Sequence, residues 1–499
     1  MIVVWQETLH VVYNYSNLLP KPTSKYVTLY LASESLVNEE YRKAESLMKV
    51  IVIGSSHGGF ETVRGILAEK PDTEIQWYER GDFISFLSCG MQLYLEGVVK
   101  DVNSVRYATA EQMRAKGVSV FVHQEVTSIN PDEHTVVVHN LDDDSTREEK
   151  YDKLVLSAGA VPAQIPVPGG DLANVYAMRG RDWAIKLKEK TVDPTVQNVT
   201  VVGAGYIGIE AAEVFSKAGK HVTLIDILPR PLALYLDQEF TDILSDTLKD
   251  HNIYLAPGQT VKSFTGENGQ VSTVKTDQAE YPSDLVIETA GIKPNTDWLK
   301  GTLDLTDKGL VKVNDHLETS QPDIYAVGDS TKVPFAPTGK TLQIALATNA
   351  RRQGRIAAKN VLGDDMKMPA VSGSSALSVF DYHFASTGIK EGTSAANGIL
   401  SQSIFVTDTT QPPFVPGKAG NQKVYFKLTF DPGNHRILGA QIMSKRDVTA
   451  NINAISLAVQ TKMTLDDLAY ADFFFQPGFD RPWNIMNVAA QKALHDLTD

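Results

Sequence analysis

Cysteine is almost absent from this sequence of 499 residues, which contains one, Cys89. A single thiol excludes a disulfide within the chain and is typical of a reducing compartment. The sequence also lacks any run of about 18 apolar residues, so it predicts no transmembrane helix. Its first residues lack the basic segment of a secretory signal and place Glu7 and His10 where an apolar core would be. We therefore expect a cytoplasmic protein.

Basic residues are also fewer than acidic ones. Lys and Arg number 47 against 60 Asp and Glu, which gives a formal net charge of -13. This balance argues against a nucleic acid or an anionic membrane as the main partner. Hydrophobic residues make up 42% and charged residues 21%, as in ordinary globular proteins. At about 150 residues per domain, the length predicts about three domains.

Two stretches combine a β-rich run, a glycine turn and a helical pattern. The first begins at Met48 with MKVIVIGSSHGGFETVRGILAEK, and the second, residues 197–227, reads QNVTVVGAGYIGIEAAEVFSKAGKHVTLIDI. This order is typical of a unit that binds a dinucleotide at the N-terminus of its helix. The sequence therefore predicts an α/β protein with two Rossmann-like dinucleotide-binding domains.

The second glycine turn matches G-x-G-x-x-G with Gly203, Gly205 and Gly208. In this motif the glycines allow a tight turn, close approach of the pyrophosphate and close helix packing. Asp226 ends the next strand, where a carboxylate binds both ribose hydroxyls and would repel a 2′-phosphate. This turn favours NADH, although Arg230 is close enough to keep NADPH as an alternative.

The first turn, GSSHGG, departs from the motif because Ser56 stands between Gly54 and Gly59. Glu79 supplies the ribose carboxylate at the end of the next strand, but alone the turn also fits a domain that binds nothing. Further on, TSQPDIYAVGDS leads into Asp329. This segment resembles the FAD-binding strand of flavoproteins with two dinucleotide sites, in which the aspartate holds the ribityl chain. The three elements in this order favour FAD at the first turn and NADH at the second.

The same order predicts five segments. Residues 1–47 show no clean period and are expected to be an N-terminal extension that is non-native or poorly ordered. Residues 48–160 and 291–365 are the two parts of the FAD-binding domain, and residues 161–290 form the NAD-binding domain. In residues 366–499, short alternating runs such as KVYFKLTF precede a helical stretch, which predicts an α+β C-terminal domain.

Cys89 lies in FISFLSCGMQLYLEG, between a β-like run and a helix-like one. A free cysteine is most often a buried and inert side chain. At a helix N-terminus, however, the dipole and free N–H groups lower the pKa of a thiol, so we expect a reactive thiolate here. Without a partner thiol, Cys89 can cycle only through a sulfenic acid or a mixed disulfide with a small thiol.

From Met48 onward the sequence resembles the FAD-dependent pyridine nucleotide-disulfide oxidoreductases. The segments that carry this resemblance are GSSHGGFE, ISFLSCGMQLYLEG, VKDVNSVRY, GYIGIEAAE, IALATNARRQGR and YADFFFQPGFDRPWN. Neither Ile84 nor Tyr94 can complete a C-x-x-x-x-C pair with Cys89, so the chain is similar to the single-cysteine branch. Similarity to the NADH peroxidases of this branch is greatest. It implies that NADH reduces the flavin, the flavin reduces Cys89 sulfenic acid, and the thiolate attacks hydrogen peroxide.

The resemblance also implies roles for individual residues. Cys89, His57 and Arg351 would be catalytic, with the histidine handling protons or holding peroxide and the arginine tuning its charge. The implied FAD-binding residues are Gly54, Ser55, Ser56, His57, Gly58, Glu79, Cys89, Ser157, Ala158, Gly159, Ala160, Arg179, Asp329 and Ala347. The implied NAD-binding residues are Gly203, Gly205, Tyr206, Ile207, Gly208, Asp226, Tyr235 and Gly291. No metal is expected, and the C-terminal domain would form the interface of a homodimer or homotetramer.

Three other functions stay open. Water-forming NADH oxidases resemble this chain but carry a C-T-H-A-G type of turn where it has SSHGG, which favours the peroxidase. A CoA-disulfide reductase would need a pocket for a bulky anionic thiol. A redox sensor that holds FAD and NADH without turnover also fits the two nucleotide folds. We expect hydrogen peroxide and NADH to be the substrates.

Overall fold

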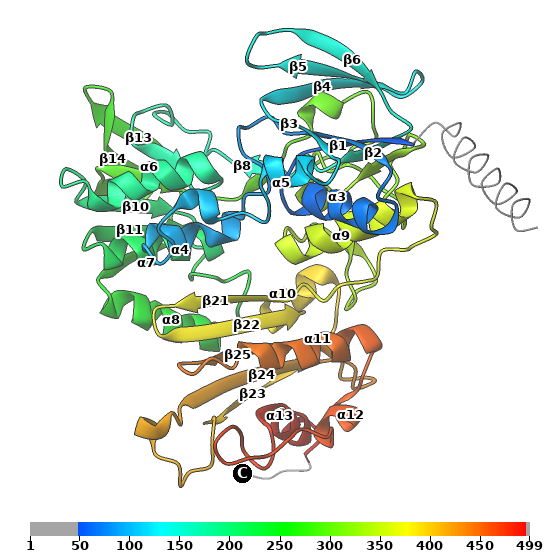
Figure 1. The fold of residues 1–499 in the computed structure, drawn as a ribbon. Helices are drawn as coiled ribbons and strands as arrows, with labels where there is room; N and C mark the ends of the chain where they lie inside the picture. The colour runs from blue at the N-terminus through cyan, green and yellow to red at the C-terminus, as the bar shows by residue number, and fades with distance from the viewer. Residues whose placement is uncertain (1–47, 496–499) are drawn as a thin grey trace, which may run out of the picture. The chain divides into compact units, whose positions relative to one another are not determined.

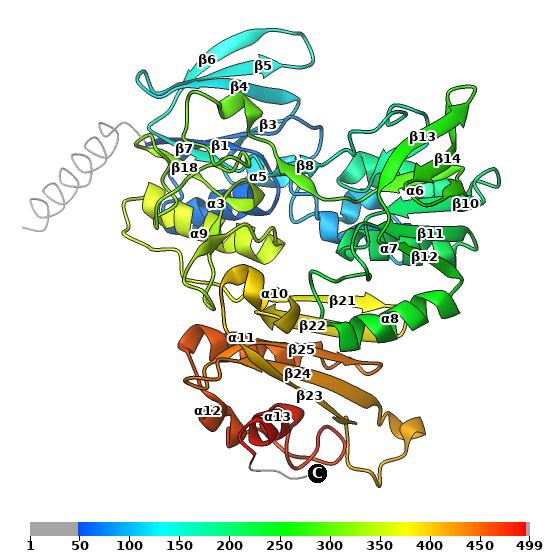
Figure 2. The ribbon, with the colours of Figure 1, turned by 180° about the vertical axis from the view of Figure 1, so that it is seen from behind.

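The computed structural model describes residues 48–495 (Figures 1 and 2). Among the described residues, those from Lys49 onward form one compact unit. The predicted N-terminal extension, residues 1–47, lies outside the described residues. Within the described part, no helix is both long and apolar enough to cross a membrane.

The first sheet has five parallel strands in the order β18-β7-β1-β2-β3. Its strands are β1 (Lys49–Ile53), β2 (Glu74–Tyr78), β3 (Ser119–Phe121), β7 (Lys153–Leu156) and β18 (Ile324–Ala326). The central strand is fully buried at Val50, Ile51 and Val52, as expected for a parallel sheet covered on both faces. Most strands come from the first third of the chain, and β18 joins them much later.

Helices α3 (His57–Glu69) and α9 (Ala347–Val361) pack side by side below this sheet in Figure 1. Their close approach depends on glycine. A Cβ added to Gly354 would lie 2.4 Å from the carbonyl oxygen of Gly58, and one added to Gly65 would lie 2.6 Å from Cβ of Ala358. The segment that contains α9, although late in the sequence, therefore packs closely against the helix that begins at the first glycine turn.

The second sheet repeats the design with the order β12-β11-β10-β16-β9, again all parallel. Its strands are β9 (Val175–Ala177), β10 (Asn198–Val202), β11 (His221–Asp226), β12 (Ile253–Pro257) and β16 (Leu285–Glu288). The helices of this part are α6 (Arg181–Val192), α7 (Tyr206–Lys217) and α8 (Gln238–Asp250). Ile209, Ala212 and Phe215 of α7 are fully buried in the core.

Two short strands connect the two parallel sheets. β8 (Ala160–Pro162) follows the first sheet, β17 (Ile292–Pro294) follows the second, and they pair antiparallel. Small antiparallel sheets extend each unit: β4 (Gln124–Asn130), β5 (Thr135–Asn140) and β6 (Thr146–Lys150) in one, and β13 (Val261–Glu267), β14 (Gln270–Thr276) and β15 (Glu280–Pro282) in the other. A further pair consists of β19 (Val333–Pro334) and β20 (Thr341–Leu342).

The C-terminal part is an antiparallel sheet in the order β21-β22-β25-β24-β23. Its strands are β21 (Ser375–Val379), β22 (Tyr382–Gly388), β23 (Gln402–Thr409), β24 (Lys423–Phe430) and β25 (Ile437–Ser444). The apolar face of helices α11 (Ile452–Thr461), α12 (Leu465–Ala469) and α13 (Ile485–Ala493) shares one core with this sheet. Of the aromatic run at 473–475, Phe473 packs against that core, whereas Phe474 and Phe475 are exposed.

The predicted α/β class with two dinucleotide-binding folds and a separate α+β C-terminal part is confirmed. Strand β18 follows the second sheet in the sequence but pairs with β7 of the first. The first sheet is therefore built from segments before and after the second sheet. The exact domain boundaries at residues 160, 290 and 365 stay a prediction.

Candidate active site

The two glycine turns have the same geometry. Gly54 after β1 and Gly203 after β10 have φ angles of +90° and +106°, a region that favours glycine. A Cβ added to Gly59 would lie 1.9 Å from the carbonyl oxygen of Gly54, and one added to Gly208 would lie 1.8 Å from that of Gly203. The first and third glycines are therefore required for each helix to begin against its own strand.

Both predicted ribose carboxylates lie at their turns. Glu79 accepts hydrogen bonds from the backbone N–H of Ser55 at 3.1 Å and from its Oγ at 2.5 Å. Asp226 accepts one from the backbone N–H of Ala204 at 2.5 Å. The carboxylate thus occupies the same place in both units, although Ser56 replaces the second glycine of the first turn.

The second turn is open where a pyrophosphate would approach. The nearest atoms to a Cβ added at Gly205 belong to the Tyr235 ring, at 3.7 Å and beyond. That ring stacks on Tyr206 with centroids 4.2 Å apart, and the Tyr206 hydroxyl lies 2.7 Å from Oγ of Ser375. Gly291 has a φ of +120° and open space around its Cβ position. These residues, predicted for NAD, leave room for a dinucleotide along the turn. Tyr206, Ile207 and Tyr235 are partly buried and pack against the core.

The residues predicted for FAD surround the first turn. Ser157 Oγ accepts a hydrogen bond from the backbone N–H of Gly59 at 3.0 Å, and a Cβ on Gly54 would lie 2.2 Å from the Ser157 carbonyl oxygen. Asp329 accepts a hydrogen bond from Arg179 at 2.9 Å. The other predicted residues are Ser56 at the start of α3, Ala158 and Gly159 between β7 and β8, Ala160 at the start of β8, and Ala347 at the start of α9.

The loop that carries Cys89 is fastened to this turn. Ser85, with a φ of +56°, donates its backbone N–H to the Ser55 carbonyl oxygen at 3.0 Å. Its Oγ donates to the carbonyl oxygen of Ala108 at 2.8 Å, and its own carbonyl oxygen accepts from the N–H of Tyr107 at 3.3 Å. Cys89 itself lies in the short 3-10 turn Ser88–Gly90, next to the helix α4 (Met91–Leu95).

His57 and Cys89 lie within electrostatic reach of the same ion pair, because the charges of Asp329 and Arg179 act on both side chains. Burial and then the charge of Arg351 lower the pKa of His57 below its usual value. The imidazole is therefore neutral at neutral pH. The charges of Arg351 and of the Asp329–Arg179 pair thus act on His57, and the same pair acts on Cys89. The catalytic roles of His57, Cys89 and Arg351 stay a prediction.

The predicted lowering of the Cys89 pKa is wrong for the chain itself. Cys89 is accessible, but neighbouring protein atoms partly desolvate its thiol, and this effect and then the charge of Glu210 raise the pKa above its usual value. α4 has only five residues, so its dipole is too weak to outweigh them.

A Glu210→Gln variant is expected to lower the pKa of Cys89, because it removes this negative charge. Burial, together with Glu213 and Glu96, raises the pKa of Glu210 itself to about 7, so its charge is present above that pH. Alkylation of the reduced thiol by iodoacetamide needs the thiolate and rises as pH passes the thiol pKa. The alkylation profile should therefore move to lower pH in the variant. Glu133→Gln, on an exposed turn, is the control, and an unmoved midpoint in Glu210→Gln would contradict the assignment.

Several residues at the site could not be found from the sequence. Tyr107 Oη lies 3.3 Å from Nδ1 of His57, and the Arg351 guanidinium stands 4.4 Å from the centre of the Tyr107 ring. Arg351 also donates to Glu61 at 2.6 Å, and the Glu61 side chain is only 7% exposed. The segments VKDVNSVRY and GSSHGGFE contain Tyr107 and Glu61, but no spacing rule marks them as part of a site.

Comparison with known proteins agrees with this geometry. Residues 48–354 match the pyridine nucleotide-disulphide oxidoreductase family, and residues 374–485 match the dimerisation domain of that family. An NADH oxidase of Enterococcus faecalis is 42% identical over 90% of this chain and 100% of its own length. A coenzyme A polysulfide/persulfide reductase of Pyrococcus horikoshii is 28% identical over 89% of this chain and 98% of its own.

A solved structure shows the same arrangement. The water-forming NADH oxidase from Lactobacillus brevis, bound to NADH, superimposes with a TM-score of 0.86 at 41% identity, covering 90% of this chain and 98% of that one. The family match covers both dinucleotide-binding units and the C-terminal part. The chain therefore belongs to the pyridine nucleotide-disulphide oxidoreductase family and is an oxidoreductase with FAD and NADH as its cofactors.

Proposed function

We propose that this chain uses NADH to reduce hydrogen peroxide to water at Cys89. The observation that supports the proposal is a single thiol, without a second cysteine anywhere in the sequence, on a loop fastened to the first glycine turn near His57. A dithiol cycle is impossible for such a residue. A thiolate that attacks peroxide becomes a sulfenic acid, which suits a lone cysteine.

The cycle balances in two steps. The Cys89 thiolate, one hydrogen peroxide and one proton give the sulfenic acid and water. The sulfenic acid then takes two electrons and one proton to give thiolate and a second water. Bound FAD would supply the transfer of two electrons from NADH to an acceptor. Gly54, Glu79, Ser157 and Asp329 would hold it, since they line the turn and the ion pair beside it.

His57 assists this chemistry as a neutral imidazole. If Nδ1 accepts the hydroxyl proton of Tyr107, the ring carries its own proton on Nε2 and can donate it to a bound peroxide. Burial and then the charge of Arg351 keep the ring neutral, and Glu61 holds Arg351 in place. Tyr107 therefore acts through His57 as a positioning residue.

A Tyr107→Phe variant is expected to reduce kcat/KM for hydrogen peroxide by about tenfold, within the range for one proton-handling contact. Its phenyl ring keeps the packing on Phe60, whose ring lies 5.0 Å away, and loses only the bond to His57. Peroxide-dependent NADH consumption measures the effect. Tyr254→Phe, at an exposed position of β12, is the control. Equal kcat/KM in all three proteins would show that the hydroxyl plays no part.

The source of the peroxide separates two finer functions. The relatives named NADH oxidase, including the water-forming enzyme of Lactobacillus brevis, favour a chain that makes peroxide from dioxygen and then reduces it at Cys89. These relatives therefore support water-forming NADH oxidase better than NADH peroxidase as the specific function of this chain.

The first turn supports the second candidate, an NADH peroxidase that takes peroxide from solution. An oxidase-type C-T-H-A-G turn would place alanine at position 58. A Cβ there would lie 2.8 Å from Oγ of Ser157 and 2.9 Å from Cγ2 of Val327, so an alanine at position 58 would force these two side chains to move. The packing around the turn is therefore adapted to SSHGG.

NADH consumption by the FAD-loaded protein tests the proposal. It is measured without oxygen with hydrogen peroxide, and then in air with catalase and no added peroxide. Fast anaerobic oxidation at one NADH per peroxide with little in air supports the peroxidase, and fast oxidation in air at two NADH per dioxygen supports the oxidase. No NADH oxidation with either acceptor would contradict both.

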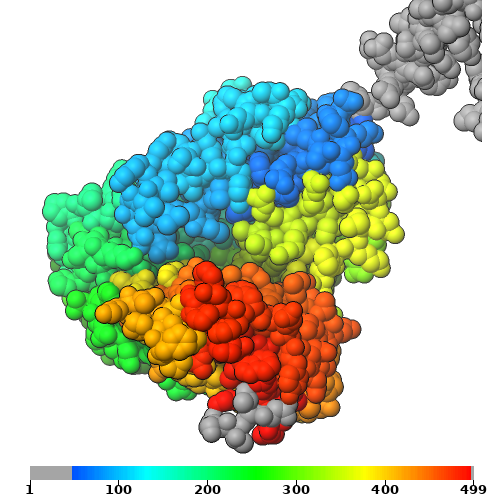
Figure 3. Space-filling view, turned by 60° about the horizontal axis from the view of Figure 1, so that its bottom comes forward, coloured from blue at the N-terminus to red at the C-terminus, as the bar shows by residue number. Residues whose placement is uncertain are grey.

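We further propose that the chain forms a homo-oligomer through its C-terminal part, the face nearest the viewer in Figure 3. Phe474, Phe479 and Trp483 are 71%, 65% and 48% exposed, and large exposed aromatics in one segment are typical of an interface. The match of residues 374–485 to a dimerisation domain supports the same conclusion.

A further inference from the structure

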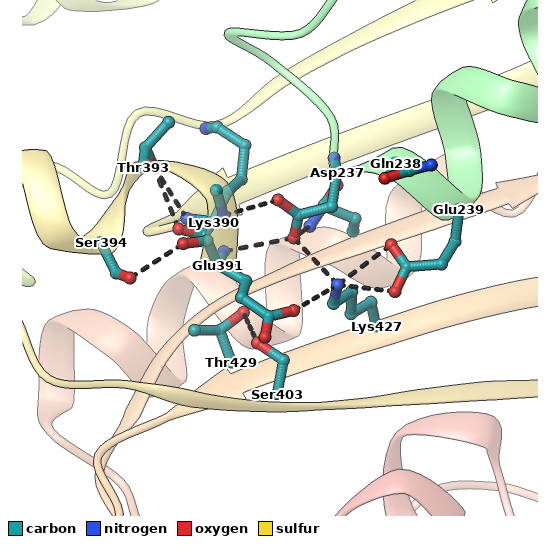
Figure 4. Close-up of polar contacts among 12 residues, drawn as sticks. Asp237, Gln238, Glu239, Lys390, Glu391, Thr393, Ser394, Ser403, Lys427 and Thr429 are labelled. Atoms are coloured by element: carbon teal, nitrogen blue, oxygen red, sulfur yellow. Dashed lines mark hydrogen bonds and ion pairs between the residues drawn. The ribbon is translucent and has the colours of Figure 1, made fainter.

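A buried lysine joins the NAD-binding part to the C-terminal sheet (Figure 4). Lys427, in the middle of β24, has a side chain only 4% exposed. Its Nζ lies 2.8 Å from Oε1 of Glu239, 2.6 Å from Oε2 of Glu391 and 3.4 Å from Oδ2 of Asp237. A buried ammonium group is stable only with such partners. The three carboxylates therefore compensate the buried charge of Lys427.

Asp237 is the most constrained member of this cluster. Its side chain is 6% exposed and accepts hydrogen bonds from Nε2 of Gln441 at 2.7 Å and from the backbone N–H of Gly392 at 2.9 Å. Its own N–H donates to Oε1 of Gln441 at 2.6 Å. Gln441 is the cross-strand neighbour of Lys427 in β25. Asp237, at the start of α8, is thus held from the C-terminal sheet and from the short helix α10 (Glu391–Ser394).

The segment that ends at Asp237 carries Tyr235. It begins at Leu232, whose φ of +57° is unusual for a branched side chain and whose N–H donates to the carbonyl oxygen of Ala204 at 2.8 Å. The N–H of Tyr235 donates to the carbonyl oxygen of Leu232 at 2.8 Å. One end of residues 232–237 is therefore fixed to the glycine turn and the other to the Lys427 cluster. Between them, the Tyr235 ring is held next to Gly205.

We propose that Lys427 is a positioning residue for NADH: through Asp237 and Gln441 it holds Tyr235 over the second glycine turn in the orientation that receives the dinucleotide. The inference deepens the proposed function and rests on its use of NADH as the reductant. It is independent of the acceptor, since none of the hydrogen bonds and ion pairs given above for Lys427 and Asp237 involves the cysteine loop. Loss of Lys427 should affect NADH binding rather than the later steps.

A Lys427→Met variant of the FAD-loaded protein tests this role. Two quantities are measured: the KM for NADH with dichlorophenolindophenol as acceptor, which does not need Cys89, and the Kd for NAD+ by equilibrium dialysis. Both are expected to rise about fivefold or more while kcat stays within about twofold. Lys427→Arg should restore most of the affinity. Lys445→Met is the control, because Lys445, just after β25, is 47% exposed and pairs with Asp381 in the turn between β21 and β22.

Unchanged KM and Kd in a folded Lys427→Met protein would overturn the proposal, as would an equal change in Lys445→Met. If Lys427→Met does not fold, Gln441→Leu carries the test. It removes only the hydrogen bonds to Asp237, and the same rise in KM and Kd is expected. Failure of the proposed function would give a different result from failure of this inference. The unaltered protein would still reduce the dye with NADH but would not reduce hydrogen peroxide.

Discussion

A Cys89→Ser variant is expected to lose NADH-dependent reduction of hydrogen peroxide, with kcat lower by on the order of 10³-fold or more, as for other nucleophile deletions. Serine keeps the size of the side chain but cannot form a sulfenic acid. FAD and NADH binding should persist, because the glycine turns are untouched. The rate of peroxide-dependent NADH oxidation, followed anaerobically, measures the loss.

The same variant also separates the two finer functions. For an oxidase, Cys89→Ser should still consume NADH in air but release hydrogen peroxide, whereas for a peroxidase it should do neither at a useful rate. Ser88→Ala is the matched control, since Ser88 is the neighbouring residue of the same 3-10 turn. Full peroxide turnover in Cys89→Ser would rule out the thiol cycle.

A Gly208→Ala variant is expected to lose about 3 kcal/mol or more of unfolding free energy, the upper range for overpacking in a closely packed site. The added Cβ would lie 1.8 Å from the carbonyl oxygen of Gly203 and 2.8 Å from Oγ1 of Thr289. Because backbone cannot yield cheaply, α7 must move away from β10. Urea denaturation of the FAD-loaded protein and the Kd for NAD+ are the measurements, and both should worsen.

Two comparison variants make this result specific. Gly417→Ala lies in open space and should leave both stability and NAD+ affinity unchanged. Gly205→Ala meets no atom closer than 3.7 Å, so it should fold normally but bind NAD+ more weakly, because its Cβ enters the space open to the pyrophosphate. Unfolding by Gly205→Ala, or normal stability of Gly208→Ala, would refute the steric account of the turn.

The sequence predicts the two dinucleotide-binding folds well because their constraints are local. In each turn the helix begins directly against its own strand, which fixes the spacing of Gly54 and Gly59 and of Gly203 and Gly208. The short distances from an added Cβ to the backbone follow from that local geometry. The carboxylates Glu79 and Asp226 come at the end of the next strand for the same reason. The alternating runs after residue 366 likewise predict the antiparallel sheet, though not its strand order.

The rest depends on contacts between distant segments. Glu210 raises the pKa of Cys89 from α7, a helix of the other dinucleotide-binding unit. A rule based only on the helix next to Cys89 therefore predicts a pKa shift in the wrong direction. Tyr107 and Glu61 join the site only after α3, α9 and the cysteine loop have packed together. Lys427 looks like an ordinary strand residue until α8 packs on the C-terminal sheet. Such residues have no signal in composition or spacing.

Trapping of Cys89 sulfenic acid tests the central claim most directly. The FAD-loaded protein, with Cys89 reduced to the thiol and the flavin oxidised, is treated with one equivalent of hydrogen peroxide without oxygen. It is then labelled with a sulfenic acid-specific dimedone reagent and analysed by peptide mass spectrometry. The account predicts one label on Cys89, formed only after peroxide and abolished when NADH is added before the reagent. An unlabelled Cys89 in protein that still consumes peroxide and NADH would contradict it.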